Sequence, residues 1–64
     1  MIKSGDIVTK MAGKRFGASA KVISIFPKVN EAIIQFFDGS QEKVAMNDIQ
    51  PASDEVNQAW KTLS

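Results

Sequence analysis

The 64-residue sequence contains neither cysteine nor histidine, and these two absences exclude several kinds of site. Without cysteine the chain can form no disulfide and offers no thiolate ligand to a metal ion. Without histidine it lacks the most common acid–base catalyst of enzymes and the usual nitrogen ligand of zinc. A nucleophile–histidine pair cannot be assembled either. We therefore expect a protein that is not an enzyme and that holds no metal ion or cofactor.

Long apolar runs are also missing. Runs such as Ala32-Ile33-Ile34 are far shorter than the roughly 20 residues that a membrane-spanning helix needs. The first residues, Met1 to Ser4, are not followed by the apolar segment of a signal peptide. We expect an intracellular protein that does not enter a membrane: nuclear in a eukaryote, and cytoplasmic or nucleoid-associated in a bacterium.

The carboxylates and the one glycine-rich segment form no catalytic motif. Asp6, Asp38 and Asp48 each occupy a position where a turn favours aspartate. The segment AGKRFG, residues 12–17, superficially resembles a phosphate-binding loop, but it lacks the first glycine and the Ser/Thr after lysine. This supports the expectation of a binding protein.

Three segments alternate between apolar and polar residues with a period of two, the pattern of half-buried strands: residues 6–11, 18–26 and 31–37. In the second segment the period places Val22 and Ile25 on opposite faces. In the third segment Ala32, Ile34 and Phe36 share one face, and Phe37 points to the other.

Turn residues connect these segments to further elements. Asp38-Gly39 predicts a two-residue type I′ turn, followed by a return strand over residues 40–46. A single helical turn is expected around Ile49, before Pro51. Short strands joined by tight turns predict an all-β fold, a small antiparallel barrel of four or five strands.

The last segment, residues 53–64, has the character of a short amphipathic helix. Ser53 is a good N-cap, and two acidic residues follow it where the helix dipole favours negative charge. One helical stripe contains Val56, Ala59, Trp60 and Leu63. The helix is expected either to pack on the barrel or to dock a partner, and Trp60 could equally support a weak dimer in place of a monomer.

Several short motifs resemble those of Tudor domains, which are SH3-like barrels. The motifs are Gly5-Asp6-x-Val8, Ala20-x-Val22-x-x-Ile25, Phe36-x-Asp38-Gly39-Ser40 and Val44…Asp48-Ile49-x-Pro51. Residues 33–52 are especially similar to the second half of the Tudor domains in Polycomb-like proteins and JmjC demethylases. The resemblance covers residues 3–52. It implies a five-stranded antiparallel SH3-like (Tudor-like) barrel over residues 1–52, followed by the short C-terminal helix.

Tudor domains commonly hold a methylated lysine or arginine in a cage of aromatic rings, and the resemblance implies where that cage would lie. Its aromatic positions match Met11, Ala18 and Phe36, its acidic position matches Asp38, and a further aromatic would fall on Ser40 or Glu42. Only Phe36 and Asp38 keep the residue type. Cation–π attraction weakens with each ring lost, so weak or no methyl-lysine recognition is expected.

A peptide or protein ligand, such as a histone tail, is the first functional hypothesis. The residues expected to bind it are Met11, Phe16, Ala18, Phe36, Asp38 and Ser40. Phe16 could replace a missing ring, although its position is two residues away from the family pattern. Phe36 has two possible roles at this point, because it could either complete the core beside Ile34 or face the ligand.

Binding of DNA or RNA is the alternative hypothesis, and it depends on an uneven distribution of charge. Residues 1–28 contain six basic side chains and one acidic one, a charge of +5, whereas residues 29–64 contain two basic and six acidic, a charge of −4. Basic residues near an aromatic suit phosphate contact and base stacking. The candidates are Lys10, Lys14, Arg15, Phe16 and Lys21. The net charge of only +1 and the possibility of two ordinary solvated faces weigh against this hypothesis.

Overall fold

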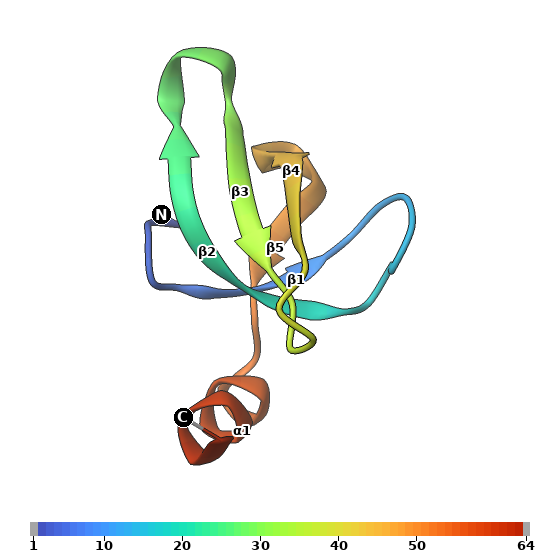
Figure 1. The fold of residues 1–64 in the computed structure, drawn as a ribbon, viewed down its shortest axis with the longest axis vertical. Helices are drawn as coiled ribbons and strands as arrows, with labels where there is room; N and C mark the ends of the chain where they lie inside the picture. Colours follow the sequence, from blue (N-terminus) through green and yellow to red (C-terminus); the bar gives the residue numbers. More distant parts are fainter. Residues whose placement is uncertain (1, 64) are drawn as a thin grey trace.

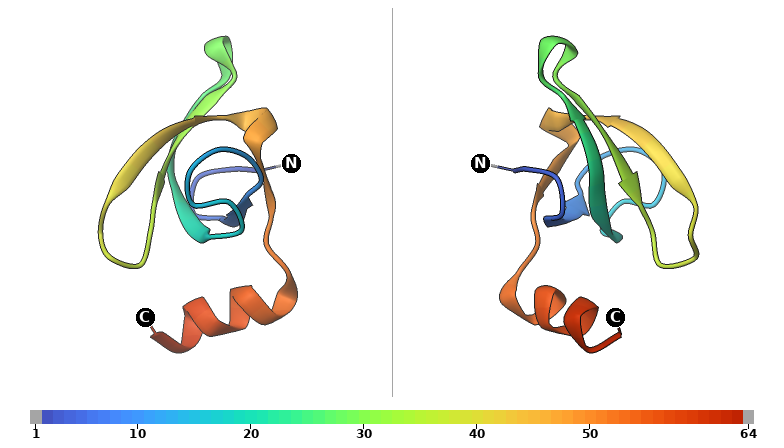
Figure 2. Two further views of the ribbon diagram at one scale, coloured as in Figure 1. Left: turned by 90° about the vertical axis from the view of Figure 1, so that its right-hand side faces the viewer. Right: turned by 60° about the vertical axis from the view of Figure 1, so that its left-hand side comes forward.

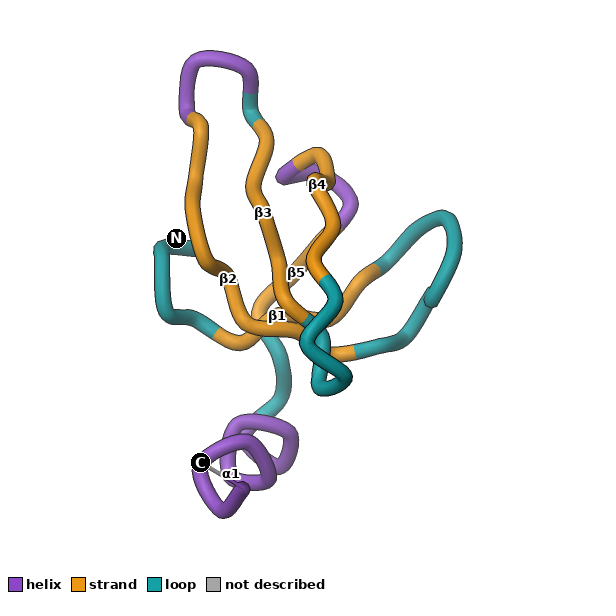
Figure 3. Tube along the Cα trace, in the orientation of Figure 1, coloured by secondary structure: helices purple, strands orange, loops and turns teal. Residues whose placement is uncertain are grey.

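The structure, a computed structural model that describes residues 2–63, consists of one antiparallel sheet followed by a C-terminal helix (Figures 1 and 3). The strands are β1 (Ile7–Lys10), β2 (Ser19–Phe26), β3 (Glu31–Gln35), β4 (Gln41–Ala45) and β5 (Ile49–Pro51). Two 3-10 helices, η1 (Pro27–Val29) and η2 (Met46–Asp48), connect strands, and the chain ends in α1 (Asp54–Leu63). None of the helices in the described range is long and apolar enough to cross a membrane.

The five strands pair in the order β4-β3-β2-β1-β5, and every neighbouring pair is antiparallel. This confirms the prediction of a mostly β fold with five antiparallel strands. The sheet bends strongly, so that β4 and β5 curve toward one side (Figure 2). The strand pairing leaves β4 and β5 as two edges of the sheet, so it does not confirm that the sheet closes into the expected barrel.

The core lies on the concave face of this sheet. Its buried members come from all five strands and the β3–β4 loop: Val8, Ala20, Val22, Ala32, Ile34, Phe36, Val44 and Ile49. The alternation predicted for residues 31–37 is confirmed, because Ala32, Ile34 and Phe36 are buried whereas Phe37 is 57% exposed. Ala20 and Ala32, in the central strands β2 and β3, have small side chains. These leave room on the concave face for the larger side chains of the core.

A β-bulge in β2 changes the face on which the end of that strand presents its side chains. Val22 pairs with Ile34, but the next pair joins Ser24 to Ile33, so one extra residue is inserted in β2. Beyond the bulge Ile25 packs against the core and Ile23 is 38% exposed. The strict period of two predicted that Ile25 and Val22 lie on opposite faces of the sheet. This prediction was wrong, because the bulge brings Ile25 to the core face.

The β3–β4 connection also differs from the predicted two-residue turn. The Gly39 amide donates to the Phe36 carbonyl at 3.0 Å, and the Phe36 amide donates to the Ser40 carbonyl at 2.9 Å. Only Gly39 in this loop has a positive φ, of 88°. This is the three-residue loop in which a type I turn is followed by a left-handed glycine. The helical turn expected around Ile49 lies earlier, in η2, and Ile49 begins β5.

Lys10 is the one charged residue buried in the described part of the chain, with 4% exposure. Its Nζ donates to the Glu42 carboxylate and forms an ion pair with it. Since β2 and β3 lie between β1 and β4 in the sheet, this pair spans the concave side of the molecule. Burial of a charge is tolerated when an opposite charge satisfies it, and among residues 2–63 no buried side-chain polar atom lacks a partner.

The helix α1 begins as predicted and is held to the sheet through Trp60. The Ser53 hydroxyl accepts a hydrogen bond from the Val56 amide at 3.3 Å. The Trp60 ring stacks on Phe37, with centroids 4.0 Å apart and planes inclined by 20°. Its indole N–H donates to the Ser19 hydroxyl at 3.0 Å. Leu63, on the predicted apolar stripe, is 70% exposed, so the stripe is only partly covered.

Replacement of Glu42 is expected to destabilise the fold because it leaves the Lys10 ammonium group buried without a counter-charge. We expect Glu42→Leu to lower the free energy of unfolding by about 1–3 kcal/mol in urea titrations. This is less than for a fully buried pair, because the Glu42 side chain is 38% exposed. Glu31→Gln is the control, since its partner Lys43 is 61% exposed and the pair is long at 3.8 Å. Equal stability of the Glu42 variant and the wild type would contradict this role.

Trp60→Ala is expected to release α1 without unfolding the sheet. A ten-residue helix is marginal alone, so its amide protons should lose most of their protection from hydrogen exchange once the stack is removed. Amides of β2 and β3 should keep theirs. Gln58→Ala is the matched control on an exposed helix position. Unchanged protection of α1 in the Trp60 variant would show that other contacts hold the helix.

Candidate functional site

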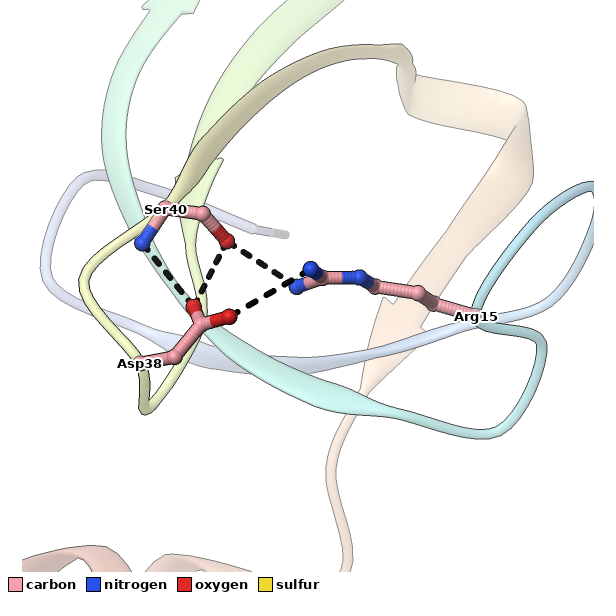
Figure 4. A network of polar contacts seen from close by, with 3 residues as sticks. All are labelled: Arg15, Asp38 and Ser40. Atoms are coloured by element: carbon pink, nitrogen blue, oxygen red, sulfur yellow. Dashed lines mark hydrogen bonds and ion pairs between the residues drawn. The ribbon is translucent and has the colours of Figure 1, made fainter.

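The loop after β1 and the loop between β3 and β4 meet at one end of the sheet, where Arg15 joins them (Figure 4). The Arg15 Nη1 donates to the Ser40 hydroxyl at 3.0 Å. The Nη2 donates to the Asp38 carboxylate at 3.3 Å and forms an exposed ion pair with it. These contacts connect residues 23 and 25 positions apart in the chain.

The guanidinium group also lies over the ring of Phe36, with 4.4 Å between its central carbon and the ring centroid. This is the geometry of a cation–π interaction. Phe36 is only 6% exposed and belongs to the core. The two roles considered for this ring are therefore compatible: Phe36 packs in the core and still contacts a cation at the surface.

Asp38 is held in its position mainly by Ser40. The Ser40 hydroxyl donates to Asp38 Oδ1 at 2.6 Å, and the Ser40 amide donates to the same oxygen at 2.9 Å. These two hydrogen bonds, with a smaller contribution from the Arg15 charge, lower the pKa of the Asp38 carboxyl. The carboxylate is thus charged at neutral pH and oriented before any ligand arrives.

The backbone of the first loop directs Arg15 toward this site. Arg15 has φ 62°, in the left-handed region that side chains other than glycine rarely adopt. Such a conformation costs about 1–2 kcal/mol for an ordinary residue. Gly13 and Gly17, on either side, have φ 75° and 87° and form the bends of the loop. The contacts of the guanidinium group offset the strain at Arg15.

Two shallow hollows flank the Arg15–Phe36 contact, and both residues line each of them. The smaller hollow, of ≈ 290 Å³, is also lined by Lys14, Ser40, Gln41 and Glu42. The larger one, of ≈ 390 Å³, is also lined by Ala18, Ser19, Phe37 and Asp38. Because Ser19 and Phe37 both contact Trp60, α1 borders the larger hollow. We call these two hollows and the Arg15 network the loop-end site.

The structure brings together four of the six residues expected to bind a peptide: Ala18, Phe36, Asp38 and Ser40 line the loop-end site. Met11 and Phe16 line neither hollow. They are 37% and 67% exposed, and the Met11 amide instead bonds to the Asp48 carbonyl at 2.7 Å. Phe16 therefore does not replace a missing cage ring in this conformation.

The residues proposed to bind nucleic acid are not gathered on one surface. Lys10 is buried and paired with Glu42, and Arg15 is paired with Asp38. Lys21 lines a separate hollow beside Trp60. Lys14, Arg15 and Phe16 are exposed together on the first loop, but the charge of Arg15 is paired with Asp38.

A functional argument for this chain has to start from the geometry of the loop-end site. The sequence matches no model of a known protein family, and no curated protein matches it significantly. Within residues 2–63, no three acidic side chains lie close enough together to hold a metal ion. The arrangement at the loop-end site can hold a cation through an aromatic face, a carboxylate and a hydroxyl, and Arg15 supplies that cation.

The dominant role of Ser40 in orienting Asp38 can be tested by the pKa of the Asp38 carboxyl. We expect Ser40→Ala to raise this pKa toward its ordinary value, and Arg15→Gly to raise it by less. Glycine is chosen at position 15 because it accepts the left-handed backbone without strain. Titration of the Asp38 carboxyl carbon by NMR measures the shift, with Lys14→Ala as control. A larger rise for Arg15→Gly than for Ser40→Ala would contradict the order of causes.

Proposed function

We propose that the chain is a non-enzymatic binding module, an SH3-like barrel of the Tudor type over residues 1–52, that recognises a protein or peptide segment at the loop-end site. Five antiparallel strands and the convergence of Phe36, Asp38 and Ser40 support the proposal. These are the residues through which the sequence resembles Tudor domains at the β3–β4 loop. The helix α1 (Asp54–Leu63) follows and borders the site.

The observation that carries the proposal is the position of Arg15. A cation already lies over Phe36 and beside Asp38, so the groups that could hold a ligand cation are assembled and occupied from within. A lysine, methylated or not, would have to compete with an intramolecular arginine. A single ring also provides less cation–π attraction than a cage. Both facts support the proposal that methyl-lysine is recognised weakly or not at all.

A peptide ligand has other contacts available at this site. The larger hollow offers the apolar surfaces of Ala18 and Phe37 beside Phe36, and Phe37 is more than half exposed. The Asp38 carboxylate would attract a basic segment, such as a histone tail, once Arg15 moves away from it. A nuclear location in a eukaryote, or a nucleoid or cytoplasmic one in a bacterium, belongs to the same proposal.

Binding of DNA or RNA is the second candidate, favoured by the joint exposure of Lys14 and Phe16 on the first loop. An exposed ring beside an ammonium group suits base stacking and phosphate contact. The pairing of Lys10 and Arg15 with carboxylates leaves few cations for a polyanion. Such binding would be weak and would fall steeply with salt.

The experiment is a titration of isotope-labelled protein, followed by amide NMR, with a basic peptide, its trimethyl-lysine form and oligothymidine. The basic peptides should shift the amides of Phe36, Asp38 and Ser40. Arg15→Gly should strengthen their binding by up to about tenfold, because it removes the competing ion pair and cation–π contact.

Lys14→Ala is the matched control for a lost positive charge on the same loop, and it should not strengthen binding of a basic peptide more than about twofold. Asp38→Asn combined with Arg15→Gly should abolish the gain. The proposal fails if Arg15→Gly weakens peptide binding. It also fails if the peptides shift no amide signals whereas oligothymidine shifts those of Lys14 and Phe16.

A further inference from the structure

The hairpin formed by β2, η1 and β3 carries a second exposed surface at the opposite end of β3 from the loop-end site (Figure 1). Phe26 is 40% exposed and Val29 is 61% exposed, and neither belongs to the core. With Ile33 they line a hollow of ≈ 530 Å³ whose remaining lining residues are Lys28, Glu31 and Lys43. We call this the hairpin-tip surface.

The strand register shows that this surface lies on the face of the sheet away from the core. Phe26 pairs with Glu31, and Ile33 pairs with Lys43, whereas the intervening pair of Ala32 and Val44 is buried. Asn30 closes the hairpin in a left-handed conformation, with φ 57°, which asparagine tolerates. The apolar side chains at the tip are therefore fixed in place by the turn and are not needed for the core.

The charges around the hollow indicate what could occupy it. Lys28 makes no ion pair within the described chain, and Lys43 reaches Glu31 only at 3.8 Å, with its own side chain 61% exposed. Two ammonium groups and one carboxylate thus border an apolar floor. The complementary ligand has large apolar side chains flanked by carboxylates.

We infer that the hairpin-tip surface docks an acidic amphipathic segment of a partner protein. The apolar side chains of that segment occupy the hollow between Phe26, Val29 and Ile33, and its carboxylates pair with Lys28 and Lys43. A hollow of this size is in the range that holds a compact ligand or a few side chains. The inference does not depend on the function of the loop-end site.

Two other occupants fit less well. A nucleic acid would need several phosphate contacts, and the Glu31 carboxylate in the lining would repel it. A symmetric dimer would place this surface against itself, so two surfaces that each carry two lysines and one glutamate, and thus an excess of positive charge, would meet. An acidic amphipathic peptide also meets the Glu31 carboxylate, but it needs only the two lysines for its charges, and its apolar side chains can fill the hollow between Phe26, Val29 and Ile33.

The test is a titration of isotope-labelled protein with a short peptide of leucine, glutamate and glycine, and with the same peptide in which lysine replaces glutamate. The acidic peptide should shift the amides of Lys28, Val29 and Asn30. Lys28→Glu should weaken its binding about fivefold or more, since it turns one attraction into a repulsion. Val29→Ser should also weaken it, because the valine is part of the apolar floor.

Lys14→Glu is the matched control, a charge reversal on an exposed lysine at the loop-end site, and it should change the affinity less than about twofold. Both lysines are exposed, so neither reversal is expected to unfold the protein. The inference is overturned if the basic peptide shifts the tip amides as strongly, if oligothymidine shifts them in preference, or if they shift on concentration of the protein alone.

Discussion

Lys10 links the two sides of the sheet beside the loop-end site, because its ammonium group is buried and paired with Glu42. Its backbone fixes the base of the first loop: the Lys10 amide donates to the Ala18 carbonyl, and the Gly17 amide donates to the Lys10 carbonyl, both at 2.8 Å. Its side chain reaches Glu42, which lies just after the β3–β4 loop. One residue therefore ties together the two loops that form the site.

The ion pair of Lys10 and Glu42 also connects β1 to β4 across the concave side, as hydrogen-bonded strand pairing would do in a closed barrel. The described ladder leaves β4 and β5 as edges, so no backbone bonds hold the concave side together between β1 and β4. A chain of this size buries few apolar side chains, and those of its core are mostly alanine, valine and isoleucine. A charge that can be satisfied only when β1 and β4 approach each other favours one curvature over the alternatives, at the cost of desolvation.

Local patterns in the sequence predicted the features that depend on near neighbours. The alternation in residues 31–37 and the Ser53 cap involve residues within a few positions of one another, and the structure contains both. The bulge in β2 could not be predicted, because one inserted residue is decided by how β2 meets β3 and the core. The β3–β4 loop has three residues where a two-residue loop was expected, since Asp-Gly fits both lengths.

The residues of the loop-end site could be predicted only where the resemblance to Tudor domains matched cage positions to residues of this chain. Phe36, Asp38 and Ser40 came from the match at the β3–β4 loop. The basic residues of the first loop were interpreted together, as one cluster, because their partners lie far away in the sequence. Glu42 is 32 positions from Lys10, and Asp38 is 23 positions from Arg15. The order of charges along a chain gives no sign of such pairs. The ion pairs of Lys10 and Arg15 are therefore seen only in the three-dimensional structure.

The contacts of Arg15 are individually weak, and that weakness makes the loop-end site adjustable. An exposed ion pair contributes about 0–1 kcal/mol and an exposed cation–π contact about 0.5–1 kcal/mol, while the left-handed backbone of Arg15 costs a similar amount. These contributions nearly cancel, so the state in which Arg15 covers Phe36 and Asp38 is favoured by at most about 1 kcal/mol, and a ligand that had to displace Arg15 would be weakened by less than about tenfold. Gly13 and Gly17, both with positive φ, lie on either side of Arg15, and the Gly17 amide donates one of the bonds that anchor the loop to Lys10. Ser40 therefore orients Asp38 in advance, and the cover that Arg15 places over Phe36 and Asp38 is held by only a small free energy.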